Sequence, residues 1–310
     1  MKKVSIVTPS FNEKENIEKL IEAVRNIFFN ELKNYKFEHI IIDNKSTDGT
    51  IEILKDLAKR YKELKIIINT KNFGHILSPH HARLQSTGDL IINLAADFQD
   101  PPEIIPKFIQ EWENGYKVVL GIKKKESNET FLIKYLRAIF YKLIRKLSNN
   151  EFYENFSSYC LIDRVVLEKI KKINDRNPYF RGLIASIGYV PSKIYYKKNV
   201  REKGKSKNNF YTLYDLAILG ITNYSKLPMR LCIFVGFFLT CISLTVGIFY
   251  FFYKIIFWDE FSTGIAPLII TISFFMSFIL FFLGIIGEYL LLLLSKIITL
   301  PVIEEERINF

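Results

Sequence analysis

The sequence predicts an α/β protein in which a mostly parallel sheet carries helices on both faces, followed by a two-helix membrane hairpin. Short apolar runs alternate with helix-length segments between residues 4 and 121, which is the pattern of a parallel sheet covered on both sides. The composition then changes, because residues 231–295 are overwhelmingly apolar whereas the chain before residue 225 is rich in charge. A mixed α/β domain over residues 1–225 and a membrane anchor over 226–310 follow from these observations.

Each element of the first domain has its own signal. Apolar runs bounded by polar or turn residues predict buried strands, and the longer segments between them predict helices. The expected strands are Val4–Thr8, Ile40–Ile42, Ile66–Ile68, Leu90–Asn93 and Lys117–Gly121, and the expected helices are Asn16–Phe29, Thr50–Tyr61, Pro79–Ser86 and Pro102–Asn114. Ligands of such sheets gather at the carboxyl ends of the strands, so we expect the site there.

The anchor consists of two stretches that are long enough to cross a bilayer, which takes about 20 residues. Leu231–Tyr253 and Phe261–Gly287 contain no charged residue, and we place the spans at about 231–253 and 264–287. Basic residues flank them on one side, which puts both termini and the first domain in the cytoplasm of a multi-pass inner-membrane protein with a short cytoplasmic tail. These residues are Lys226, Arg230 and Lys296.

Charge and cysteine content exclude other classes. The net charge is +11, but no basic nucleic-acid-binding motif is present, so an anionic membrane surface and phosphorylated substrates explain the charge better than nucleic acid. The three cysteines show neither metal-ligand spacing nor a disulfide framework. The chain opens directly into an expected strand, so we expect no cleaved signal peptide.

Acidic residues follow three of the expected strands. Glu13 follows the first, Asp43 the second and Asp97 the fourth, so their side chains are expected at one sheet edge. Asp97 and Gln99 would point to the same side if strand geometry persisted, and a carboxylate with an amide oxygen suits Mg²⁺ or Mn²⁺. Asp100 is expected to cap the helix that follows.

Three motifs carry a resemblance to a known family. Residues 7–13 (Val-Thr-Pro-Ser-Phe-Asn-Glu), 42–50 (Ile-Asp-Asn-Lys-Ser-Thr-Asp-Gly-Thr) and 96–103 (Ala-Asp-Phe-Gln-Asp-Pro-Pro-Glu) resemble the family-2 glycosyltransferases of GT-A fold. The resemblance is closest to the polyprenyl-phosphate glycosyltransferases of the dolichyl-phosphate mannosyltransferase type. It extends over nearly the whole chain because that group also has a C-terminal two-helix membrane anchor.

The resemblance implies roles for specific residues. Nucleotide binding would fall to Pro9, Phe11, Glu13, Asp43, Asn44 and Asp97, and the metal to Asp97 and Gln99. Residues 201–207 resemble the family's Arg-x-x-Gly-x-Ser-Lys loop, so Arg201, Ser206 and Lys207 would bind the diphosphate or the lipid phosphate. The catalytic residues would be Asp97, Arg201 and Lys207.

The chain departs from the family at three positions. Asn44 stands where a second aspartate is usual, Ala95 takes the first place of the Asp-x-Asp motif, and Ser158 falls where relatives place a catalytic aspartate. A serine is not a base at neutral pH, so the missing acid favours a phosphate acceptor, whose second pKa of about 6 leaves it already ionised.

Further candidates come from the residue types themselves. Contacts with the sugar or the diphosphate are expected from His75, His81, Arg83, Ser158 and Arg181, with a plain helix surface as the alternative for the residues between 75 and 83. Amphipathic helices near 130–148 and 209–224 are expected to lie at the membrane surface, with packing on the sheet as the alternative for the first.

The expected activity is that of an inverting glycosyltransferase. It would move a sugar from a nucleotide-diphosphate sugar to a polyprenyl (undecaprenyl or dolichyl) phosphate, for glycan or cell-envelope assembly. One alternative is transfer to a saccharide acceptor, although the Gln-x-x-Arg-Trp signature of processive synthases is absent. Another is a non-catalytic membrane scaffold, motivated by Asn44, Ala95 and Ser158. The oligomeric state is left open between a single copy and a homo-oligomer.

Overall fold

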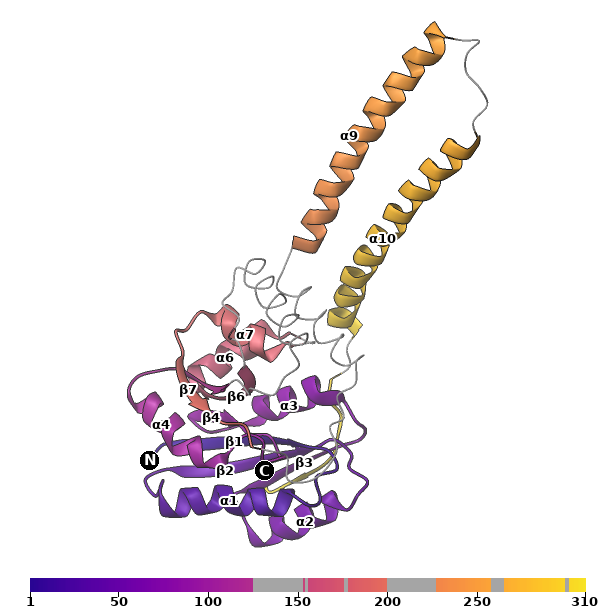
Figure 1. The fold of residues 1–310 in the computed structure, drawn as a ribbon. Helices are drawn as coiled ribbons and strands as arrows, with labels where there is room; N and C mark the ends of the chain where they lie inside the picture. The colour runs from indigo at the N-terminus through magenta and orange to yellow at the C-terminus, as the bar shows by residue number, and fades with distance from the viewer. Residues whose placement is uncertain (125–152, 154–155, 176–177, 200–226, 258–264, 299–300) are drawn as a thin grey trace.

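The protein forms one eight-stranded sheet with helices on both faces and two long helices that project away from it (Figure 1). The computed structural model describes residues 1–124, 153, 156–175, 178–199, 227–257, 265–298 and 301–310. The strands are β1 (Lys3–Ser10), β2 (Lys36–Asp43), β3 (Leu64–Asn69), β4 (Leu90–Asn93), β5 (Val118–Lys123), β6 (Phe156–Asp163), β7 (Ser192–Tyr196) and β8 (Glu304–Ile308). The helices are α1 (Ile17–Asn30), α2 (Thr50–Arg60), α3 (Gly74–Gln85), the 3₁₀ turn η1 (Pro102–Ile104), α4 (Ile105–Glu113), α6 (Arg164–Ile173), α7 (Phe180–Ile187), α9 (Leu227–Ile256) and α10 (Ile265–Ile298).

The strand order is β7-β5-β6-β4-β1-β2-β3-β8. The centre is parallel, because β1 pairs in parallel with both β2 and β4, and β2 with β3. Strands β6 and β8 pair antiparallel with their neighbours. The predicted α/β class with a mostly parallel sheet is confirmed, and each of the five expected strands is present with its apolar run buried.

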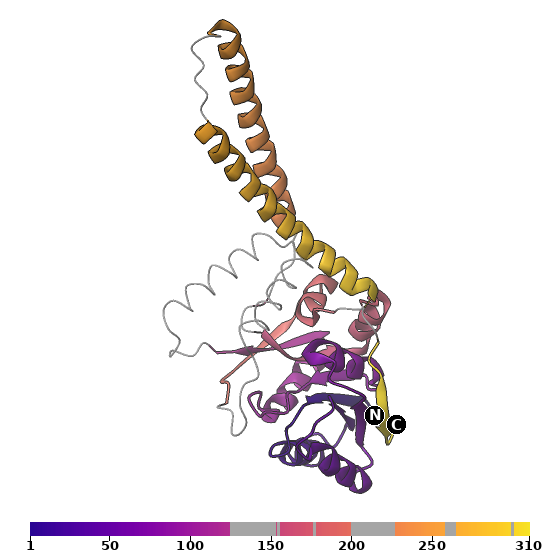
Figure 2. The same cartoon turned by 90° about the vertical axis from the view of Figure 1, so that its right-hand side faces the viewer.

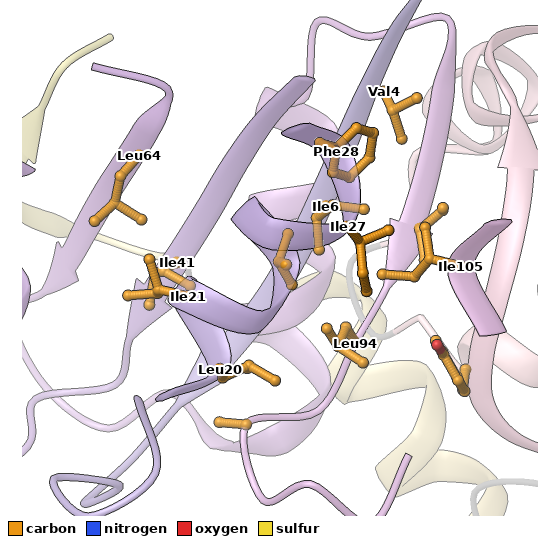
Figure 3. Packing of buried hydrophobic residues seen from close by; sticks show 14 of the residues in the cluster. Val4, Ile6, Leu20, Ile21, Ile27, Phe28, Ile41, Leu64, Leu94 and Ile105 are labelled. Carbon is orange, nitrogen blue, oxygen red and sulfur yellow. The ribbon is translucent and has the colours of Figure 1, made fainter. Parts of the chain in front are cut away.

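Alternate residues of the strands feed two hydrophobic cores, one on each face of the sheet. On one face, strand residues such as Val4, Ile6 and Ile41 pack against apolar residues of α1, α2 and α4 (Figure 3). On the other face, strand residues such as Val7 and Ile91 pack against α3, α6 and α7. Because both faces of the sheet centre are covered, its strands are mainly apolar, and polar residues inside them, such as Ser5, Thr8 and His39, are buried and hydrogen-bonded.

Three elements differ from the expectation. Helix α3 begins at Gly74, five residues before Pro79, and it tolerates this proline inside at the cost of one backbone hydrogen bond. Strand β4 ends at Asn93 and residues 96–100 form turns and bends, so strand geometry does not persist to Asp97. Asp100 does not cap the following helix, because its carboxylate is bound by Lys123 and Tyr196.

The two C-terminal helices lie side by side and leave the domain together, with the ends at Leu227 and Ile298 nearest the sheet (Figure 2). Within the described residues, the segment Phe274–Leu294 of α10 is long and apolar enough to cross a membrane, and none of it is buried inside the protein. Large apolar side chains point outward along both helices, for example Phe237 and Leu291.

The expected tail after the second long helix contains a strand of the sheet. Strand β8 pairs antiparallel with β3 and covers what would otherwise be an exposed edge. Its acidic side chains contact basic ones on neighbouring elements: Glu304 with His81, Glu305 with Lys45 and Glu306 with Lys55. Asn309 then donates hydrogen bonds to the carbonyl oxygens of Ala58 (2.8 Å) and Leu64 (2.9 Å), which ties the last residues to the domain.

Candidate active site

A cleft of about 340 Å³ opens at the carboxyl ends of β1 and β4, where the parallel sheet predicts a site. One wall is helix α3 and the other is the start of α7, while β6 contributes to the floor. Its lining consists of Pro9, His75, Ile76, Pro79, Arg83, Asn93, Leu94, Ala95, Asp100, Ser158, Tyr159, Pro178, Tyr179, Phe180 and Arg181. Five of the residues predicted from the sequence therefore meet here: Pro9, His75, Arg83, Ser158 and Arg181.

Arg83 is a deeply buried charge of the cleft, with an exposed fraction of 5%, the same as that of Asp100. Its guanidinium carbon lies 3.9 Å from the centre of the Phe180 ring, and one terminal nitrogen is 3.4 Å from Asn93 Oδ1. Burial lowers the pKa of Arg83 to about 10, which leaves the side chain cationic at neutral pH. The cleft therefore holds a permanent positive charge.

Two further basic side chains line the same cleft. Arg181 donates a hydrogen bond of 3.2 Å to the carbonyl oxygen of Phe156, which holds it beside the cleft. Burial, together with the positive charge of Arg181, lowers the pKa of His75 and favours its neutral form. The arrangement is suited to an anionic group such as a phosphate.

Ser158 lines the cleft in a strained backbone conformation, with φ = +81°. Leu120 of β5 pairs with Cys160 and Ile122 pairs with Phe156, so Gly121 faces a bulge in β6 that contains Ser158. A Cβ atom at Gly121 would lie 3.0 Å from the carbonyl oxygen of Tyr159, so a larger residue would push the two strands slightly apart here. A left-handed conformation costs a non-glycine residue about 1–2 kcal/mol, and the bulge holds Ser158 in the cleft despite that cost.

The loops after β1 and β2 are joined into one unit. The backbone N–H of Asn12 donates to Ser46 Oγ (2.8 Å), and Asn12 Oδ1 accepts from the backbone N–H of Thr47 (2.8 Å). The backbone N–H of Glu13 donates to Thr50 Oγ1 (3.1 Å). Phe11 and Glu13 are half-buried on this unit, with surface available to a ligand.

Asp43, at the end of β2, is fully buried beneath the same unit. Its carboxylate accepts from the backbone N–H and the hydroxyl of Ser46, at 2.7 and 2.6 Å. Burial raises the pKa of Asp43, and the hydrogen bonds from Ser46 oppose that rise. Asp43 was predicted to bind the nucleotide. In this conformation its carboxylate stabilises the loop after β2 and is not exposed to a bound molecule.

Asn44, where the family usually has an aspartate, uses both halves of its amide. Its nitrogen donates to Asn72 Oδ1 (2.8 Å) and to the carbonyl oxygen of Gly74 (3.1 Å). Its oxygen accepts from Asn69 Nδ2 and from the backbone N–H of Phe73, both at 2.9 Å. These bonds join the ends of β2 and β3 to the start of α3, so Asn44 fixes the helix that carries His75 and Arg83.

The predicted metal ligands lie in the turn after β4, outside the residues that line the cleft. Asp97 is half-buried, and its Oδ1 accepts from the backbone N–H of Gln99 at 3.2 Å. Among the described residues, no group of three or more His, Cys, Asp or Glu side chains is placed to hold a metal ion. A cation bound by Asp97 and Gln99 would therefore need further ligands, such as phosphate oxygens of a substrate.

Other predicted residues are not brought to the cleft. His81 is absent from its lining and contacts Glu304 of β8. Arg201, Ser206 and Lys207, and the amphipathic helices expected near 130–148 and 209–224, lie outside the residues that the structure describes.

Asn93 and Phe180 are among the lining residues that the sequence did not identify as functional. Asn93 was read only as the end of an apolar strand, although a polar residue closing such a run is itself a signal. The place of Phe180 over the Arg83 guanidinium could not be predicted, because it depends on the packing of α7 beside α3.

Comparison with known proteins identifies the family. The family model "Glycosyl transferase family 2" matches residues 5–171. A bactoprenol glucosyl transferase of Shigella phage SfX is 33% identical over 288 residues, which are 93% of this chain and 93% of that protein. An uncharacterized glycosyltransferase of Bacillus subtilis, YkcC, is 31% identical over 289 residues, 92% of this chain and 88% of that protein.

A solved structure, that of Staphylococcus aureus TarS 1–349 in complex with UDP-GlcNAc, is similar at a TM-score of 0.45 and 18% identity, covering 72% of this chain and 67% of that one. The family assignment depends on the sequence matches alone. The model matches more than half of the chain, and both relatives exceed 30% identity over almost its whole length. The chain therefore belongs to glycosyl transferase family 2 and is a glycosyltransferase.

Proposed function

We propose that this glycosyltransferase moves a sugar from a nucleotide-diphosphate sugar to a polyprenyl phosphate at a membrane surface. The observation that carries the donor half is the basic cleft at the carboxyl ends of β1 and β4, since two arginines, Arg83 and Arg181, line one cavity and suit a diphosphate. The acceptor half is supported by the relative named a bactoprenol glucosyl transferase, because bactoprenol is a polyprenol and the similarity covers 93% of both chains.

The reaction is a single displacement with inversion. An oxygen of the lipid phosphate attacks the anomeric carbon, the bond from that carbon to the donor diphosphate breaks, and the nucleoside diphosphate leaves with the electron pair. A phosphate monoester has a second pKa of about 6, so its oxygen is ionised at neutral pH and needs no base. Ser158 in the cleft, where relatives carry an acid, agrees with an acceptor that arrives already deprotonated.

The nucleotide would lie on the unit formed by the loops after β1 and β2. Phe11 and Glu13 are half-buried and expose part of their surface, to which a base and a ribose would bind, and Pro9 lines the cleft beside these loops. Asp43 and Asn44 are assigned to the same site, where they hold the loops and the start of α3. Arg201, Ser206 and Lys207 are proposed to bind the diphosphate or the lipid phosphate.

A divalent cation, Mg²⁺ or Mn²⁺, would be held by Asp97 and Gln99 together with phosphate oxygens of the donor. The chemistry of this donor set fits, because Mg²⁺ is commonly bound through one or two carboxylates plus substrate phosphates. Such an ion supplies charge neutralisation for the departing diphosphate. Asp97 has one carboxylate oxygen in a turn contact with Gln99, and its half-buried position keeps the group accessible.

The protein is proposed to be anchored in the cell membrane by α9 and α10, with its sheet on the cytoplasmic side. Segment Phe274–Leu294 has no buried residue, which in water would leave a large apolar surface uncovered. Strand β8 follows α10 and pairs with β3, so the chain beyond the last helix lies on the same side as the sheet. This arrangement requires an even number of crossings, as a two-helix hairpin provides.

The test uses membranes that contain the full chain, incubated with radiolabelled nucleotide sugars and a polyprenyl phosphate. Label is expected in an acid-labile glycolipid, and its formation should require the phosphorylated lipid, with the matching polyprenol as control. Label that appears only in an added saccharide would replace the lipid by a sugar acceptor. Absence of transfer from every donor, with active relatives run alongside, would refute the proposal.

A further inference from the structure

The buried arginine of the cleft lacks a counter-charge. No carboxylate forms an ion pair with Arg83 within the part of the chain that the structure describes, and Asp100, the acidic residue of the cleft lining, is bound by Lys123 and Tyr196 instead. Arg83 Nε is buried without a hydrogen-bond partner among the described residues. A buried, unpaired cation is costly, so its retention calls for a partner that is not part of the protein.

The surroundings of Arg83 hold it in place without neutralising it. The Phe180 ring covers one face of the guanidinium at 3.9 Å, and Asn93 Oδ1 accepts one long hydrogen bond of 3.4 Å. Asn93 is in turn fixed by a contact of 3.4 Å from its Nδ2 to Cys160 Sγ. Burial raises the pKa of the Cys160 thiol to about 12, so this neighbour carries no negative charge at neutral pH.

Ala95 lines the same cleft, and by the resemblance it takes the place of the first acid in the family's Asp-x-Asp motif. A methyl group there neither repels an anion nor pairs with Arg83. The cleft is therefore positively charged, and it lacks a carboxylate that could serve as a second protein ligand of a metal ion.

We infer that Arg83 is the receptor for a phosphate group of the substrate, and that this fixed cation supplies part of the charge neutralisation that a metal ion held by a complete Asp-x-Asp motif would otherwise provide. The inference rests on the proposed function for the identity of that substrate. The phosphate comes from the donor diphosphate or from the lipid phosphate, and in either case the guanidinium fork donates to its oxygens. Binding at this subsite does not require a divalent metal.

The test measures binding, not turnover, on the purified full chain in detergent with EDTA present. Inorganic pyrophosphate, UDP and GDP probe the donor, and a short-chain polyprenyl phosphate probes the acceptor, each by isothermal titration. Arg83→Met removes the cation. We expect its affinity for the relevant probe to fall about tenfold or more, as expected for hydrogen bonds to a charged group, with a smaller loss in Arg83→Lys.

Asn93→Asp supplies the missing counter-charge from the protein itself and is the sharper variant. A carboxylate about 3.4 Å from the guanidinium would pair with Arg83 and compete with the phosphate. Thermal stability should be kept or raised while the affinity for the probe falls. If Arg83 had only a structural role, the affinity of Asn93→Asp for the probe would be unchanged. This variant also allows the test to be made if Arg83→Met fails to fold.

Arg164→Met is the matched control, because Arg164 donates to the backbone carbonyl oxygens of Ser86 (2.9 Å) and Gly88 (2.8 Å) at the opposite end of β4. The variant Arg164→Met should lower stability and leave the affinity for the probes unchanged.

A loss of affinity confined to pyrophosphate and the nucleotides assigns the subsite to the donor, and a loss confined to the lipid assigns it to the acceptor. Wild-type affinity in Arg83→Met and Asn93→Asp, or no EDTA-resistant binding of any probe, overturns the inference. Because pyrophosphate binding involves neither sugar nor lipid, it can succeed even if the proposed transfer fails.

Discussion

Replacing Asn44 by the aspartate that is usual in the family should destabilise this protein. The amide nitrogen of Asn44 donates to Asn72 Oδ1 and to the Gly74 carbonyl oxygen, at 2.8 and 3.1 Å. In Asn44→Asp a carboxylate oxygen would face two acceptors at those distances, in a residue with an exposed fraction of 7%. Only the two bonds accepted from Asn69 and Phe73 would survive.

The magnitude follows from those contacts. Two lost hydrogen bonds remove about 2 kcal/mol, and the unpaired charge beside two acceptor oxygens adds at least about 1 kcal/mol, giving about 3 kcal/mol at pH 7. For a domain of this size that corresponds to a fall in Tm of about 6–12 °C. Burial and the adjacent acceptors raise the carboxyl pKa in the folded variant, so the deficit grows as pH rises and narrows at pH 5, where the protonated group can donate again.

Thermal unfolding of the full chain in detergent, followed by tryptophan fluorescence at pH 7 and pH 5, measures both effects. Asn26→Asp is the control, since Asn26 is exposed on α1 and carries the same change of chemistry. We expect its Tm to stay near that of the wild type. A Tm of Asn44→Asp equal to that of the control, or a deficit that is larger at pH 5 than at pH 7, would refute the reasoning.

Three further predictions concern the metal site, the sheet edge and acid stability. Asp97→Asn should lower turnover by about a hundredfold or more without changing Tm, because it removes the carboxylate proposed to hold the cation; unchanged kinetics would contradict that role. Deletion of residues 303–310 should lower Tm and promote self-association in size-exclusion chromatography, since it uncovers the edge of β3; wild-type behaviour would show that β8 contributes nothing. Burial lowers the pKa of His39 to about 3, so this side chain stays neutral in the folded state while the unfolded chain takes up a proton below pH 6.5. Stability should therefore fall by about 1.4 kcal/mol per pH unit from this histidine between pH 6.5 and 3, and the pH dependence of Tm should be shallower in His39→Gln.

The strands at the centre of the sheet could be predicted from the sequence, because strands that are buried on both faces are encoded by continuous apolar runs. Ile40–Ile42 and Leu90–Asn93 need no tertiary information to be recognised. Strand β8 could not be found this way: Glu304–Ile308 contains four charged residues, and its pairing depends on basic partners such as Lys45 and Lys55 that lie far away in the chain.

The candidate site was predictable in its position but not in its bonding. The order of the motifs and the positions of the strand ends predicted a site at the carboxyl ends of the parallel strands, and the cleft lies at that edge. The sequence marked Asn44 as a departure from the family, yet its function as a hydrogen-bond centre depends on Asn69 and Asn72, which only the folded chain brings beside it. In the same way the isolation of Arg83 from any carboxylate in the described structure is a property of the packed cleft.

Strand β8 sets the order in which the protein can be completed. Its residues follow the apolar helix α10 in the chain, so β3 can gain this neighbour only after α10 has been made. Until then β3 presents unpaired peptide groups to the surrounding solution. Completion of the sheet therefore depends on synthesis of the chain beyond α10, and a chain cut short before β8 would leave this edge of the sheet open.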